Sequence, residues 1–199
     1  MRTITHTFNV YKYSELNADA QDYAKQQYLD LPWRNEDFKE LVETCLKEDY
    51  PNSVLEFQYS LGYGQGDGFN ISGSLNLKDV LKYESGKFSD KEIETLKEYF
   101  EYEEFAELKK NYRYGYCLAD QNDYVGLLWD QLAWYDVDVD EILLSKLDKV
   151  VCEHVKSLCK EYEQMGYEYL YKIEDEEMDL VSAANDYEYL EDGSFYGGD

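Results

Sequence analysis

The sequence has few cations, few prolines and no long hydrophobic run. Only 19 of its 199 residues are lysine or arginine, against 44 aspartates and glutamates, so the formal net charge is −25. This balance excludes a basic nucleic-acid-binding surface. Two prolines and no serine- or glycine-rich tract leave no marked linker. We therefore expect one acidic domain over residues 1–199.

Cysteine is also scarce and unevenly spaced. The four cysteines include no CxxC pair, and they do not indicate a disulfide framework. Residues 1–13 lack the charged and apolar segments of a signal peptide, and every apolar run is too short to cross a bilayer. These absences predict a cytoplasmic protein with reduced thiols and no membrane contact.

Aromatic residues are abundant: 22 Tyr, 8 Phe and 3 Trp are enough large side chains for a folded core. Period-two alternation predicts strands at residues 4–10, 55–61, 69–77 and 112–118. Helical spacing and capping residues predict helices at residues 17–31, 38–50, 89–110, 141–165 and 174–185. The pair Asp192–Gly193 predicts a turn between two short extended stretches. The mixture predicts an α+β fold, with an antiparallel sheet of four to six strands and helices packed mainly on one face.

A glycine-rich segment, residues 62–68, separates the second and third predicted strands. It resembles a phosphate-binding loop in composition, but it joins two strands and contains Asp67 where such a loop supplies a lysine. We interpret it as a hairpin connection. A binding loop positioned by the hairpin is the alternative.

Two groups of residues are candidates for a divalent metal ion. Asp136, Asp138 and Asp140 would share one face of an extended segment, although the segment does not match a calcium-loop template. The alternative is the acidic first turn of the following helix. A zinc site built from cysteines, His6 and His154 would need ligands brought together by folding, and both histidines lie on patterned faces typical of structural residues.

Enzyme motifs are absent from the sequence. It contains no GxSxG, HExxH or Walker loop, and acidic residues are too numerous for a carboxylate pair to identify a glycosidase. We therefore predict a protein that is not an enzyme.

The C-terminal region concentrates negative charge among tyrosines. Between residues 163 and 199 the one cation is Lys172. Acids three or four residues apart on a helix lie about 5–6 Å apart, a spacing comparable with successive phosphates of a DNA strand. Such a face could act as a DNA mimic for a basic channel, whereas the alternative is that the charge only maintains solubility. The candidate partner-binding residues are Glu174, Asp175, Glu176, Glu177, Asp179, Tyr167 and Tyr171.

Three short motifs occur in an order that is familiar. They are ELNADAQ at residues 15–21, YSLGYGQGDG at residues 59–68 and NDYEYLEDG at residues 185–193. Together they resemble a family of small, mostly uncharacterised phage and prophage proteins. The resemblance implies a phage context and no catalytic residue. By analogy of class, small acidic phage proteins resemble inhibitors of host defence such as anti-CRISPR proteins.

These observations lead to one hypothesis and two alternatives. The hypothesis is a phage-encoded, non-enzymatic inhibitor in the host cytosol that binds a host defence protein, a CRISPR effector nuclease, and hinders its DNA binding without contacting nucleic acid itself. One alternative is a metal-binding protein that holds zinc or another divalent ion. The other is an accessory or structural protein of the phage.

Overall fold

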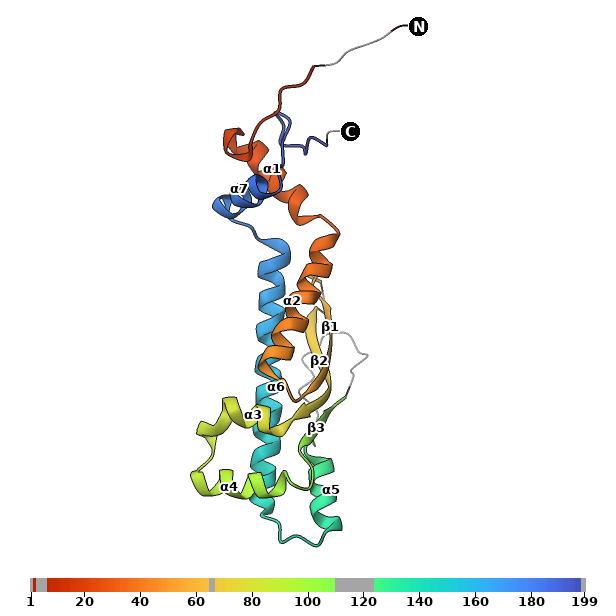
Figure 1. Ribbon diagram of the computed structural model, residues 1–199, viewed down its shortest axis with the longest axis vertical. Helices are drawn as coiled ribbons and strands as arrows, with labels where there is room; N and C mark the ends of the chain where they lie inside the picture. The colour runs from red at the N-terminus through yellow and green to blue at the C-terminus, as the bar shows by residue number, and fades with distance from the viewer. Residues whose placement is uncertain (1, 3–6, 65–66, 110–123, 198–199) are drawn as a thin grey trace. The chain divides into compact units, whose positions relative to one another are not determined.

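The computed structural model describes residues 2, 7–64, 67–109 and 124–197. Two compact units share the chain: residues 1–39 with 167–199, and residues 40–166. Two helices contribute residues to both units, α2 (Trp33–Asp49) and α6 (Glu141–Tyr171) (Figure 1).

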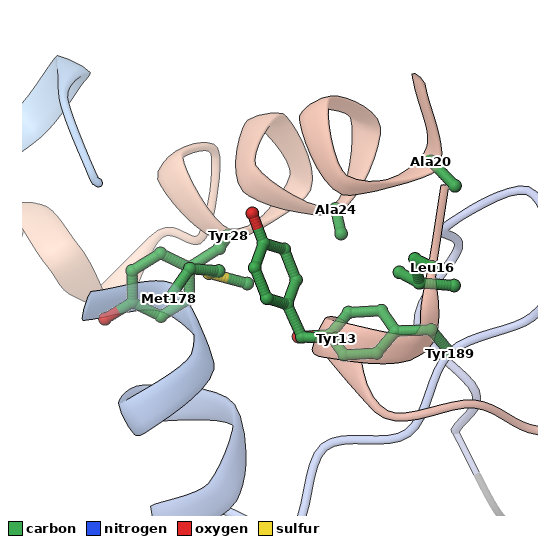
Figure 2. Packing of buried hydrophobic residues seen from close by; sticks show 7 residues of the cluster. All are labelled: Tyr13, Leu16, Ala20, Ala24, Tyr28, Met178 and Tyr189. Atoms are coloured by element: carbon green, nitrogen blue, oxygen red, sulfur yellow. The ribbon is translucent and has the colours of Figure 1, made fainter. Parts of the chain in front are cut away.

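The unit that contains both termini is built around helices α1 (Ala18–Leu29) and α7 (Asp175–Ala184). The side chain of Asn17 accepts a hydrogen bond from the Ala20 amide and so begins α1, as the sequence predicts. Figure 2 shows side chains from α1, α7 and the flanking segments converging on one apolar cluster. The buried members of the cluster are Tyr13, Leu16, Ala20, Ala24, Tyr28, Met178 and Tyr189.

The chain's end closes against this cluster through isolated backbone bridges. Tyr189 pairs with Tyr11. It also pairs with Phe195, which lies on the other side of the predicted Asp192–Gly193 turn. Gly193 has φ +85°, and a Cβ there would lie 2.1 Å from the Ala20 carbonyl oxygen, so only glycine fits. Residues 7–10 form no strand, although the alternation predicts one at 4–10; the rest of that segment lies outside the described residues.

The second unit holds an antiparallel sheet in the order β1 (Val54–Ser60), β2 (Gly68–Asn76) and β3 (Phe105–Leu108). The first two strands form the predicted hairpin, with Phe57 opposite Ile71. An aromatic stack continues from the hairpin onto α6, where the Phe69 and Tyr162 ring centroids are 5.3 Å apart. This packing joins the sheet to the longest helix, and the fold is α+β as expected.

Three features of this unit differ from the sequence prediction. The described residues contain three strands rather than four to six, and the strand predicted at 112–118 lies outside them. The predicted helix at 89–110 is wrong after α4 (Asp90–Tyr99), because residues 105–108 pair with β2 as strand β3. Leu108 therefore fits the helical spacing by coincidence, because it lies on strand β3 and its side chain is buried there.

Two further helices were not expected. Helix α3 (Leu77–Glu84) follows β2 directly, and Asn76 caps it by accepting from the Lys78 amide. Helix α5 (Gly126–Trp134) buries only Leu128 and Leu132. Both helices are short, so they carry too few turns for a clear helical period.

Candidate protein-binding surface

Four of the acidic residues predicted to bind a partner lie exposed at the beginning of α7. Glu174 precedes the helix, and Glu176, Glu177 and Asp179 lie in its first two turns. Within the part of the chain that the structure describes, no ion pair neutralises these four carboxylates. Glu176 and Asp179 are three residues apart on α7, a spacing that places their Cβ atoms about 5–6 Å apart. We call these four residues the α7 acidic face.

Asp175 has a different role from its four neighbours. Its Oδ1 accepts a 2.7 Å hydrogen bond from the Tyr13 hydroxyl and a 2.8 Å bond from Lys25 Nζ. The bonds from Lys25 and Tyr13 lower the pKa of Asp175 below its ordinary value. Burial raises the pKa of Tyr13, so the phenol keeps the proton that it donates. Asp175 therefore fastens α7 to α1 and to the segment before it through one carboxylate oxygen, while its side chain stays 65% exposed.

Replacing Asp175 with asparagine is expected to loosen α7. The asparagine side chain carries no charge to pair with Lys25, and its oxygen accepts a weaker hydrogen bond from the Tyr13 hydroxyl. Because the folded-state pKa is lowered, this stabilisation is present at neutral pH and is lost as the pH falls through the folded pKa. Hydrogen exchange of the α7 amides should be faster in D175N than in wild type at pH 7, and E176Q is the matched control that should exchange at the wild-type rate.

Tyr167 and Tyr171 lie one turn apart at the end of α6. Their ring centroids are 6.1 Å apart, and Tyr171 is 40% exposed. The neighbouring tyrosine, Tyr169, instead packs on the guanidinium of Arg34, which also donates a hydrogen bond to the Tyr169 carbonyl. The buried Tyr189 belongs to the core. Among the described C-terminal tyrosines, Tyr171 and the 39% exposed Tyr196 present exposed rings, and Tyr171 lies next to the acidic run in sequence.

The three aspartates proposed for a metal ion adopt separate local roles. Asp136 has φ +53° at the end of α5, and Asp140 caps α6 by accepting from the Leu143 amide. The Asp138 carbonyl accepts a 3.4 Å bond from the Tyr99 hydroxyl. In the described residues no group of three His, Cys, Asp or Glu side chains could hold a metal ion. The described cysteines, Cys45, Cys152 and Cys159, form no disulfide with one another, and Cys117 and His6 lie outside the described residues.

The glycine-rich loop is closed by its own aspartate. Asp67 accepts hydrogen bonds from the amides of Gly62 and Gly64, at 2.7 and 2.9 Å, and from the Ser60 hydroxyl. An anion bound by this loop would have to displace that carboxylate. The geometry favours the hairpin connection that the sequence predicts.

His154 forms the centre of a buried polar cluster. Its Nδ1 lies 2.7 Å from Glu84 Oε1, and its Nε2 lies 2.8 Å from the Tyr50 hydroxyl. Burial alone would raise the pKa of Glu84, but hydrogen bonds from His154 and Lys87 outweigh it, and the net pKa is below its ordinary value. Burial raises the pKa of Tyr50, so this hydroxyl keeps its proton at neutral pH. The cluster joins α3 and α6 to Tyr50, the residue that follows α2, as a structural element, which agrees with the prediction for His154.

Removing the Glu84 charge is expected to destabilise the protein more at neutral pH than in acid. The lowered pKa means that the ionised carboxylate stabilises the fold above its unfolded pKa and that this contribution is lost as the pH falls through the folded pKa. E84Q should lower the free energy of unfolding by about 1–2 kcal/mol at pH 7, and by less at pH 3. Urea titrations at both pH values measure this, with E153Q as a control that should change stability less, because Glu153 is half exposed. An equal loss for E84Q at both pH values would contradict the assignment.

None of the helices in the described ranges is long and apolar enough to cross a membrane. No protein-family model, curated protein or solved structure matches the chain.

Proposed function

We propose that this protein is a phage-encoded, non-enzymatic inhibitor of a host nucleic-acid-binding defence protein. The target that we propose is a CRISPR effector nuclease in the host cytosol, bound through the α7 acidic face and Tyr171 so that its DNA binding is hindered. The resemblance of three ordered motifs to phage and prophage proteins supports the phage context.

The α7 acidic face is the single observation that carries the proposal. Its carboxylates are exposed at the beginning of one short helix and have no ion-pair partner among the described residues, so their charge is available to a basic surface. The spacing of acids on a helix is comparable with that of phosphates on a DNA strand. The adjacent exposed Tyr171 can add contact area and a hydroxyl, a combination that is enriched at protein interfaces.

A competition experiment tests the proposal. A guide-loaded CRISPR effector nuclease is incubated with labelled target DNA and increasing amounts of the protein, and DNA binding is measured at several salt concentrations. Phosphate mimicry predicts displacement of DNA that weakens steeply with salt, because the Debye length falls from about 10 Å at 0.1 M to about 3 Å at 1 M. Displacement that persists at high salt would instead indicate that apolar contacts of the tyrosines supply the binding energy.

A pull-down from a bacterial lysate identifies the target without assuming it. Proteins are eluted by a salt gradient and identified by mass spectrometry. The proposal expects a nucleic-acid enzyme that added DNA or guide RNA displaces. If no such enzyme is recovered and the competition experiment shows no displacement, the proposed function is wrong.

A further inference from the structure

The end of α5 exposes aromatic side chains that the fold does not use. Trp134 is 83% exposed and Tyr135 is 60% exposed, although Trp is a highly buried residue on average. Tyr102, which follows α4, is 41% exposed, and its ring centroid lies 5.4 Å from that of Tyr135. We call Tyr102, Trp134 and Tyr135 the Trp134 patch. Exposed aromatic patches of this kind mark interaction sites.

The backbone beneath this patch is held in one conformation. The amides of Asp136 and Val137 donate to the carbonyls of Ala133 and Leu132, which closes α5 with Asp136 in the left-handed region. In the linker that follows α5 in Figure 1, the Tyr99 hydroxyl donates to the Asp138 carbonyl and accepts from the Asp140 amide. A preorganised surface loses little conformational freedom on binding, so the exposed rings can contribute more of their contact energy.

Five exposed acidic residues lie close in sequence to Trp134 and Tyr135. Within the described ranges no ion pair neutralises these exposed carboxylates. A nucleic acid would be repelled by them, and so would a second copy of this chain, which carries the same acids and a net charge of −25. Charge complementarity therefore selects a basic partner. The carboxylates belong to Asp130, Asp136, Asp138, Asp140 and Glu141.

We propose that the Trp134 patch binds a protein segment in which lysine or arginine side chains flank an apolar anchor. The aromatic rings contact the anchor, and the exposed carboxylates pair with the cations. This surface belongs to the unit of residues 40–166, whereas the α7 acidic face belongs to the other unit. The inference therefore does not rest on the proposed function.

Selection from a random peptide library displayed on phage tests this inference. The full chain is immobilised, and peptides that bind it are sequenced. We expect enriched peptides that combine basic residues with an aromatic or aliphatic residue. Enrichment of neutral or acidic peptides, or no enrichment, would overturn the proposal.

Variants then locate the binding site of the selected peptide. W134A/Y135A should bind it at least about tenfold more weakly than wild type. V54T is the matched control, because Val54 is a 72% exposed apolar residue on β1 outside the patch, and it should bind as wild type does. Equal binding by wild type and W134A/Y135A would place the peptide elsewhere and reject the patch.

A second measurement keeps Trp134 intact and so does not depend on the folding of the double variant. The chain has three tryptophans, and W33F/W129F leaves Trp134 as the single indole. Its emission should shift to shorter wavelength as the selected peptide covers the ring, and a scrambled peptide of the same charge should cause less shift. An unchanged spectrum at saturating peptide contradicts the proposal. A dimer in sedimentation analysis that W134A converts to a monomer would show that the occupant is a second copy instead.

Discussion

A variant in which Glu174, Glu176, Glu177 and Asp179 are replaced with their amides is expected to lose inhibition while remaining folded. The four side chains are exposed and have no ion pair among the described residues, so neutralising them removes no contact that the structure shows within the protein. Asp175 is left unchanged because it binds Tyr13 and Lys25. The cost to the fold is limited to the helix dipole, about 1 kcal/mol for the acids in the first turn.

The expected loss is at least tenfold, about 1.4 kcal/mol, in the concentration that displaces DNA at low salt. The matched control replaces four other exposed acids, Glu40, Glu48, Glu94 and Glu98, with glutamine. Both variants carry the same net charge, so a purely non-specific effect would weaken them equally. Circular dichroism confirms that each is folded. If the α7 variant kept wild-type potency, the α7 acidic face would have no part in inhibition.

Replacing Gly73 with alanine is expected to cause a large loss of stability in the sheet. Gly73 has φ +110°, and a Cβ at this position would lie 2.2 Å from the Val54 carbonyl oxygen. That oxygen belongs to the paired strand β1, where Leu55 stands opposite Gly73. The hairpin must therefore separate locally to accept the methyl group. Backbone strain and lost pairing together should cost about 3 kcal/mol or more.

Urea denaturation followed by circular dichroism measures this loss of stability. G86A is the matched control, because a Cβ at Gly86 meets no atom within 4 Å and its φ is not in the left-handed range. The control should unfold within about 0.5 kcal/mol of wild type. Wild-type stability for G73A would mean that β1 and β2 do not pair in the register described.

The parts of the fold that follow local rules were predictable. Asn17 and the Ser89–Glu92 capping box begin α1 and α4 where the sequence places them, because a cap depends on residues three positions apart. The β1–β2 hairpin followed from alternation on both sides of a glycine-rich turn. The 31-residue helix α6 was also predicted, although it ends six residues later than its apolar stripe suggested.

The candidate surface was predictable in outline and not in detail. The run from Glu174 to Asp179 indicates a dense anionic helix start, and the structure exposes all five of its acids, four of them without an ion pair among the described residues. Nothing in the sequence separates Asp175 from its neighbours, because its partners Tyr13 and Lys25 lie more than a hundred residues away. The Trp134 patch was not predicted either, because no helix was expected at residues 126–134.

Composition and local periodicity therefore determined the charge, the α+β class, the main helices and the hairpin, because each depends on residues close together in the chain. Tertiary structure decided which of these sequence patterns formed the element that they predict. Residues 105–108 became a strand because β2 offered unpaired backbone groups at its free edge, and that pairing outweighs a weak helical pattern. It likewise decided that Asp175 binds within the protein while Trp134 is left exposed, since burial depends on neighbours that only folding brings together.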